Sequence, residues 1–256
     1  MPTTASTIYR DSLNFYKNEL RSLVILSAFL AAILAVITSL VGPNTQEYQL
    51  MIDFIADFQK TKLASASPAE LEAMSNSVVG VAKKVLVLYS FETLLQSILV
   101  LTLLIFVMGL SSGHNPTISQ SFSSGLPRLP KMFLLVVLCS ILISAGFMVM
   151  IIPGIILLIG FAMAPVILIR QNSIGNAIRL GWKIGFSESR LLIPALGIWI
   201  LLQFGIGFLT NITLQLPDFV HNFLYYLLKN MASAWVIIYL FRLFMLVNDK
   251  YMANTH

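Results

Sequence analysis

The sequence predicts an all-α membrane protein with six transmembrane helices, and two observations carry this prediction. Hydrophobic residues make up 57% of the 256-residue chain and charged residues only 11%, whereas soluble domains carry about 25% charged residues. The apolar residues also gather in runs long enough to cross a hydrocarbon core of roughly 30 Å, which takes about 20 residues as a helix. Lipid is therefore the expected solvent for this chain.

The six spans follow from these apolar runs. In chain order they are expected at Leu23–Val41, Val85–Leu110, Phe133–Ile152, Gly154–Ile169, Leu191–Leu209 and Ala232–Val247. The first follows a polar segment and lacks small residues at a cleavage point, so we interpret it as a retained helix and not a cleaved signal peptide. The second is long enough to project beyond the bilayer.

The third and fourth spans share one apolar run, Phe133–Ile169. As a single helix it would measure roughly 55 Å, which is too long for one crossing, and the turn dipeptide Pro153-Gly154 divides it. The fourth span is then short, so a re-entrant segment remains an alternative to a full crossing. Pro165 predicts a kink within it.

The distribution of Lys and Arg gives the orientation, because these residues favour cytoplasmic loops. With the N-terminus inside, ten fall in cytoplasmic segments: Arg10, Lys17, Arg21, Arg128, Lys131, Arg170, Arg179, Lys183, Arg190 and Lys250. Five fall outside: Lys60, Lys62, Lys83, Lys84 and Lys229. We therefore expect both termini in the cytoplasm.

A weak threefold repeat is visible before the odd-numbered spans. Similar short segments begin near Ser6, Pro116 and Asn172, and each combines apolar residues at helical spacing with basic residues. We interpret them as amphipathic helices on the membrane surface, each followed by a helical hairpin. The whole chain then forms a single membrane domain, 1–256, with repeat units 1–110, 111–169 and 170–256.

The first unit carries an outer insertion, residues 42–84, which is expected to be helical. Apolar residues recur in it at helical spacing, and Ser67-Pro68-Ala69-Glu70 has the pattern of a capping box. The turn at Met150–Gly154 contains no polar side chain. Because a turn in water normally has some, we hypothesise that the insertion covers it.

Two polar residues, Glu92 and Gln96, lie four positions apart on one face of the second span. An acid in lipid is costly and has a partner or an aqueous path, so we favour a hydrogen-bonded structural contact, with a proton or cation site as the alternative. Arg242 is an obvious counter-charge, but it belongs near the inner end of its span and Glu92 near the outer end. We expect Arg242 to reach the headgroups instead.

The formal net charge of +5 is carried beside apolar spans, so anionic lipid headgroups are the expected partners, and not nucleic acid. The candidate headgroup contacts are Arg10, Lys17, Lys131, Arg179, Lys183 and Arg242. Cys139 is the only cysteine, so no intrachain disulfide is possible and no metal-ligand spacing exists.

One short segment matches a pattern found around catalytic serines. Gly109-Leu110-Ser111-Ser112-Gly113 matches G-x-S-x-G and His114 follows, but the pattern implies a nucleophile only on a strand–turn–helix. Rhomboid proteases also have six spans and a serine in a similar motif, but they pair it with a histidine inside another span, and none lies in a span core here. We expect no catalytic residues, no metal and no cofactor.

Several segments together resemble the YciC family of uncharacterised bacterial inner-membrane proteins. They include Ile8-Tyr9-Arg10-Asp11-Ser12, Leu129-Pro130-Lys131, Pro153-Gly154-Ile155-Ile156, Ala164-Pro165-Val166 and Ile238-Tyr239-Leu240-Phe241-Arg242-Leu243. These segments spread over nearly the whole chain. The resemblance implies a multi-pass protein of a bacterial inner membrane and supplies no activity or site residue.

Three functions are compatible with these features. The first is a non-enzymatic protein that organises or senses lipids, or the state of the envelope, at the cytoplasmic leaflet. The second is a small transporter or channel with Glu92 in its pathway, because transporters are often built from repeats with broken helices. The third is an accessory subunit of a membrane complex; the sequence does not distinguish a protein partner from a homo-oligomer.

Overall fold

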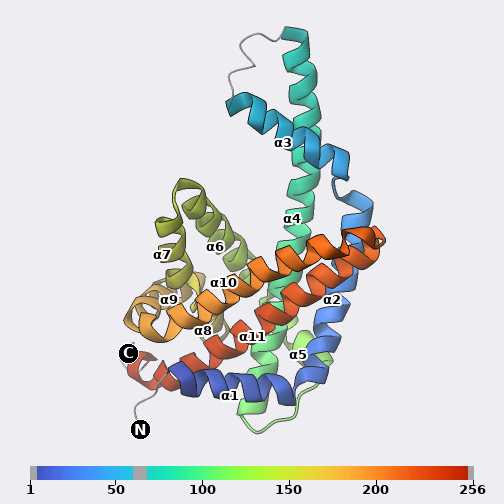
Figure 1. The fold of residues 1–256 in the computed structure, drawn as a ribbon. Coiled ribbons are helices and arrows are strands. Elements are labelled where there is room, and N and C mark those ends of the chain that lie inside the picture. Colours follow the sequence, from blue (N-terminus) through green and yellow to red (C-terminus); the bar gives the residue numbers. More distant parts are fainter. Residues whose placement is uncertain (1–4, 60–67, 253–256) are drawn as a thin grey trace.

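The computed structural model describes residues 5–59 and 68–252, and all regular secondary structure in these residues is helical, as predicted (Figure 1). The elements are α1 (Ala5–Asn18), α2 (Leu20–Val41), α3 (Thr45–Gln59), α4 (Pro68–Ser111), α5 (Ile118–Gly125), η2 (Leu126–Arg128), α6 (Leu129–Val149), α7 (Ile151–Phe161), α8 (Ala164–Gln171), α9 (Ile174–Ser187), α10 (Ser189–Ile212), η3 (Thr213–Gln215) and α11 (Asp218–Met252).

Within the described ranges, six helical segments are long and apolar enough to cross a membrane, so the predicted number of spans is confirmed. They are Leu20–Val41, Val78–Ser111, Ile118–Val149, Ile151–Gln171, Ser189–Thr210 and Asp218–Asn248. Helix α1 and the C-terminal end of α11 lie at the same end of the bundle (Figure 1). We call the membrane side facing this end the terminal side.

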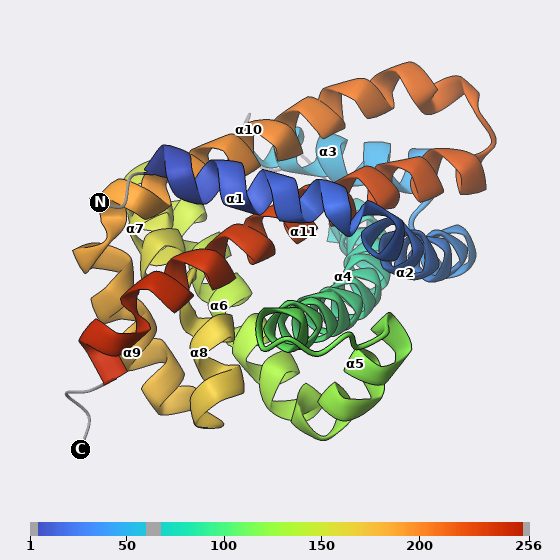
Figure 2. The same cartoon turned by 90° about the horizontal axis from the view of Figure 1, so that it is seen from below.

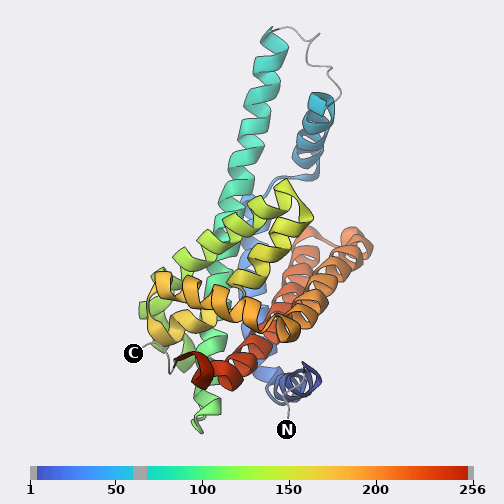
Figure 3. The same ribbon diagram turned by 90° about the vertical axis from the view of Figure 1, so that its left-hand side faces the viewer.

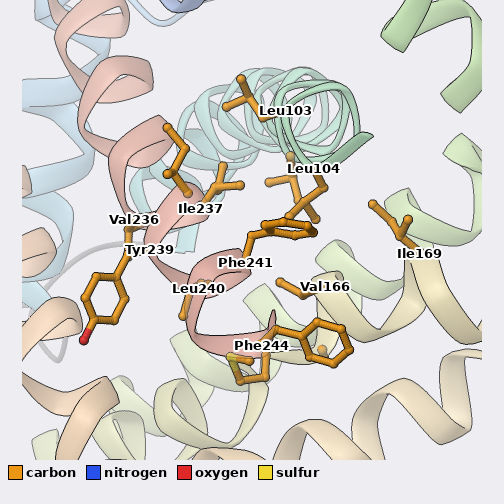
Figure 4. Close-up of a cluster of buried hydrophobic side chains, with 14 of the residues drawn as sticks. Leu103, Leu104, Val166, Ile169, Val236, Ile237, Tyr239, Leu240, Phe241 and Phe244 are labelled. Atoms are coloured by element: carbon orange, nitrogen blue, oxygen red, sulfur yellow. The ribbon is translucent and has the colours of Figure 1, made fainter. Parts of the chain in front are cut away.

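Helix α11 lies at the centre of the molecule. It contacts α2, α10, α4 and α1, and Figure 2 shows α1 crossing it on the terminal side. Phe241 and Phe244 pack among Leu103 and Leu104 of α4 and Val166 of α8 (Figure 4). A helix that is apolar all round is usually buried or lipid-exposed, and here the apolar part of α11 forms the protein core.

Helix α4 is far longer than a membrane crossing requires. Its 44 residues extend roughly 66 Å at 1.5 Å per residue, and its N-terminal part projects beyond the bundle (Figure 3). Within the described residues, the insertion at 42–84 comprises α3 and the start of α4. Ser67 of the expected capping box lies outside the described residues.

Helix α3 is joined to α4 by an ion pair. Lys84 Nζ lies 2.6 Å from Glu47 Oε1, and Glu47 also accepts a bond from the backbone N–H of Asn44. The hydrogen bond from Lys84, followed by that from Asn44, lowers the pKa of Glu47 from its ordinary value of 4.5. Helix α3 thus docks on α4 through its first turn.

This ion pair predicts an acid-sensitive position for α3. Because the folded-state pKa of Glu47 is lowered, the stabilisation is complete above its ordinary pKa and is lost as the pH falls through the lowered one. We expect spin labels at Leu50 and Val79, both exposed, to give a distance distribution that broadens below about pH 4. Glu47→Gln should be broad at every pH; an unchanged distribution in the parent protein would contradict the contact.

The expectation that the insertion covers the turn between α6 and α7 is wrong. The side chains at 148–152 remain 65–88% exposed, and α3 packs against α4 instead. The turn is tight because Gly146 and Gly154 let the helices touch: a Cβ on Gly154 would lie 2.4 Å from the ring of Phe147. An apolar turn of this kind is suited to contact with lipid.

The fourth span consists of two helices, with the break that Pro165 predicted. Helix α7 ends at Phe161 and α8 begins at Ala164, so Pro165 lies in the first turn of α8. The segment has 21 residues, or roughly 31 Å, which matches a full crossing better than a re-entrant segment.

Short helices lie at the starts of the three predicted repeat units: α1 and α9 precede the first and fifth spans, and α5 forms the beginning of the third segment, Ile118–Val149. Each buries one face against the bundle: Ile8 in α1, Gly125 in α5 and Ile184 in α9 are buried. They therefore pack on protein as well as facing outward. The repeat itself stays a prediction.

Candidate functional site

Arg242 occupies an unusual position at the terminal side. Its guanidinium carbon lies 5.1 Å from the ring centroid of Phe15 in α1, so it is held between α1 and α11. Its Nε is buried and has no hydrogen-bond partner among the described residues. Arg242 lies six residues before Asn248, where the last span ends, or roughly 9 Å along the helix. Its Nη groups can therefore reach the membrane surface.

Four further candidate headgroup residues lie on the two short helices that flank this region. Arg10 and Lys17 on α1 and Arg179 and Lys183 on α9 are all exposed. Arg10, Lys17 and Arg179 make no ion pair with the described residues. These three side chains are thus available to anionic groups at the membrane surface.

Lys131, the remaining candidate, has a structural contact. Its Nζ donates to the backbone carbonyl and to the side-chain oxygen of Asn172, both at 3.1 Å. Asn172 ends α8 in the left-handed conformation, with φ of 54°, and a lysine at a helix C-terminus satisfies carbonyls left without partners. The bond also holds the start of α6 and the end of α8 at the same depth along the bundle.

Glu92 pairs with Lys229 of α11, not with Arg242. The two side chains are 31% and 30% exposed, and the pair joins α4 to α11. Sequence reasoning missed Lys229 because it placed this residue in an outer loop, three positions before the apolar run that begins at Ala232. Gln96 is half-buried and makes no hydrogen bond within the described part of the chain.

The ion pair belongs to a polar stripe along one face of α11. Its members recur at helical spacing: Asn222, Tyr226, Lys229, Asn230 and Ser233. Tyr226 shares a hydrogen bond with Thr38 at 3.0 Å, and Asn230 donates to the carbonyl of Ser27 at 3.2 Å. Ser233 Oγ accepts bonds from two side chains of α10. The stripe binds α11 to its neighbours from the end of the bundle opposite the terminal side to about mid-span.

A cavity of about 610 Å³ opens beside the end of this stripe that lies opposite the terminal side. The ends of α2, α10 and α11 line it, with Asp218, His221 and Tyr225 among its polar side chains. The ring of Tyr225 lies 5.6 Å from Lys229 Nζ. The cavity therefore leads from the side opposite the termini towards the ion pair.

The G-x-S-x-G pattern forms a helix end. Gly113 has φ of 78°, its N–H bonds to the carbonyl of Leu110, and the N–H of His114 bonds to the carbonyl of Gly109. These are the two hydrogen bonds of a Schellman motif, which requires a residue in the left-handed conformation. The pattern is thus explained by the end of α4 without a catalytic role.

Comparison with known proteins places the chain in a family. The model of an uncharacterised protein family, UPF0259, matches residues 1–246. The chain belongs to this family. A UPF0259 membrane protein of Photorhabdus laumondii is 31% identical over 96% of this chain and 97% of its own length. A relative in Serratia proteamaculans is 29% identical, over 97% of this chain and all of its own length.

Membership of UPF0259 confirms the resemblance to the YciC family that the sequence predicted. A third member, from Pectobacterium carotovorum, is 28% identical over 96% of this chain. These relatives are named membrane proteins, and the described residues of this chain contain six helical segments long and apolar enough to cross a membrane. No solved structure matches the chain.

Proposed function

We infer that the protein is a non-enzymatic inner-membrane protein that binds and organises anionic lipids at the leaflet on its terminal side, which the charge distribution predicts to be cytoplasmic. The single observation that carries this proposal is Arg242. A cation within a span is costly unless something neutralises it, and no carboxylate of the described residues does so. A lipid phosphate at the surface supplies the missing counter-charge, and guanidinium groups bind phosphate with paired hydrogen bonds.

The exposed cations of α1 and α9 also favour lipid binding at the leaflet on the terminal side. Arg10, Lys17 and Arg179 surround the terminal end of the bundle, and each basic residue near an anionic membrane surface contributes about 1 kcal/mol. Together they attract anionic lipid, while Arg242 holds one headgroup in a defined place.

The proposal predicts selective retention of anionic lipid. In protein purified in mild detergent, mass spectrometry should find anionic phospholipid enriched over the bulk membrane. Neutralising Arg10, Lys17 and Arg179 to Gln should remove most of that enrichment, and Arg242→Gln should remove the most tightly held molecule. The matched control replaces Lys60, Lys62 and Lys83, which changes the net charge equally on the predicted outer side. Equal lipid profiles in all these proteins would overturn the proposal.

One observation favours a second candidate, a small transporter. The polar stripe of α11 and the cavity beside it run towards the Glu92–Lys229 pair, and ionisable groups within spans often mark ion or substrate paths. Below Ser233, however, the side chains of α11 pack tightly against α4 and α8. The stripe therefore ends in the core, and this fits a structural contact better than a continuous path.

A further inference from the structure

A second cavity lies at the terminal side, between the end of α4, helix α5 and the end of α8. Its volume is about 480 Å³. The polar side chains around it are Ser112, His114, Gln120, Ser121, Ser124 and Arg170. Ile105 and Met108 of α4 supply apolar lining. None of the side chains that line the cavity is a carboxylate, so its electrostatic character is positive.

Arg170 is the charged group of this cavity, and its hydrogen-bonding capacity is largely unused. Its Nη2 lies 3.7 Å from the sulfur of Met245, and its guanidinium carbon lies 6.0 Å from the ring centroid of Phe244. A thioether is a weak acceptor, whereas a guanidinium has five N–H donors. The contacts with α11 therefore orient Arg170 but leave most donors to a ligand.

The opposite wall is fixed by the end of α4 and by α5. The Schellman motif at Gly113 sets the position of His114. Helix α5 begins with a capping box, in which Thr117 and Gln120 bond each other's backbone N–H groups. It packs closely on α4, since a Cβ on Gly125 would lie 2.8 Å from the side chain of Ile105. The polar groups of this wall are thus held on well-defined elements.

A structural role explains only part of this arrangement. Arg170 lies in the last turn of α8, where a cation interacts favourably with the helix end. The hydroxyls of Ser112, Ser121 and Ser124 donate to backbone carbonyls of α4, of the N-cap of α5 and of α5 itself, respectively. Their oxygens retain capacity as acceptors, which suits a protonated phosphate or the hydroxyls of a headgroup.

We propose that this cavity binds a phosphate group, with Arg170 as its main ligand and His114 and Gln120 as further donors. The phosphate comes either from the headgroup of an anionic phospholipid or from a soluble phosphate. In its lipid form the proposal rests on the lipid-binding function inferred above and gives it a second, separate site. In its soluble form it stands without that function.

The test uses the purified full-length chain in mild detergent with two probes, phosphatidylglycerol and inorganic phosphate. Native mass spectrometry counts bound phosphatidylglycerol, and the ³¹P line width measures binding of inorganic phosphate. We expect Arg170→Gln to weaken binding of one probe at least about tenfold, which corresponds to about 1.4 kcal/mol. Arg170→Lys should weaken it less, because the charge stays but the paired hydrogen bonds are lost. Arg190→Gln, an exposed arginine outside the cavity, should bind like the parent.

The outcomes separate this proposal from the proposed function. Loss of phosphatidylglycerol in Arg170→Gln identifies a lipid site, and loss of inorganic phosphate alone identifies a soluble ligand. If Arg170→Gln binds both probes like the parent, the cavity proposal is overturned, whatever Arg242→Gln does. If Arg242→Gln retains its lipid while Arg170→Gln loses it, the cavity proposal stands and the role of Arg242 does not. Thermal unfolding of each variant checks that Arg170→Gln is folded; if it is not, the binding by His114→Gln decides in the same way.

Discussion

Replacing Lys229 by Met is expected to lower the free energy of unfolding by about 3 kcal/mol, because removal of one partner leaves the other charge unpaired in a poorly solvated place. Here the group left behind is Glu92, held on α4 within the second span. The measurement is unfolding in mixtures of mild detergent and dodecyl sulfate, followed by circular dichroism. Lys83→Met, at an exposed position in the half of α4 away from the terminal side, is the control and should change little.

The double variant Lys229→Met with Glu92→Leu should recover stability to within about 1 kcal/mol of the parent, because apolar residues often replace an ion pair without loss. A Lys229→Met variant as stable as the parent would contradict the pairing.

Glu92 also separates the two candidate functions. If Glu92 couples ion movement, Glu92→Gln abolishes ion uptake into proteoliposomes; if the pair is structural, uptake by parent and variant is indistinguishable.

The second large effect is expected at Gly185 of α9. A Cβ on Gly185 would lie 2.3 Å from the carbonyl oxygen of Ile159, a backbone atom of α7. Backbone yields less readily than a flexible side chain, so α9 must move away from α7. Overpacking of this kind costs about 1–3 kcal/mol, and we expect Gly185→Ala to lie at the upper end of this range in the same unfolding assay.

The matched control for Gly185 lies on the same helix. A Cβ on Gly175 has no heavy atom within 4 Å, so Gly175→Ala should change stability by less than about 1 kcal/mol, in the stabilising direction, through helix propensity alone. If both alanine variants unfold like the parent, the close packing of α9 on α7 is wrong.

The number and order of the spans could be predicted because each depends on the composition of one continuous segment. The break at Pro165 and the helical insertion could be predicted for the same reason, because the effect of a proline and the spacing of apolar residues are also local properties of the sequence. The partner of Glu92 could not be predicted from one segment alone, because the pairing depends on the relative depth and rotation of α4 and α11. Extending the last helix back to Phe219 and comparing depths would have brought Lys229 to the level of Glu92.

The basic residues beside the spans also differ in how far their roles could be predicted. The sequence identifies Lys131 and Arg170 equally as basic residues beside spans, but only the packing assigns the first to Asn172 and places the second in a cavity. The prediction that the insertion covers the α6–α7 turn was wrong because it assumed that the turn lies in water. A turn without polar side chains is stable in lipid provided that its helices satisfy the backbone.

The tight α6–α7 turn also bears on how the chain is assembled during synthesis. Residues 132–169 contain no charged side chain, and the glycine contacts across the turn hold α6 and α7 together from within this segment. These two helices can therefore enter the bilayer as one preformed hairpin from the ribosomal side, without translocation of a hydrophilic loop. The first hairpin differs, because with the predicted cytoplasmic termini its polar insertion between α2 and α4 would have to be carried across the membrane.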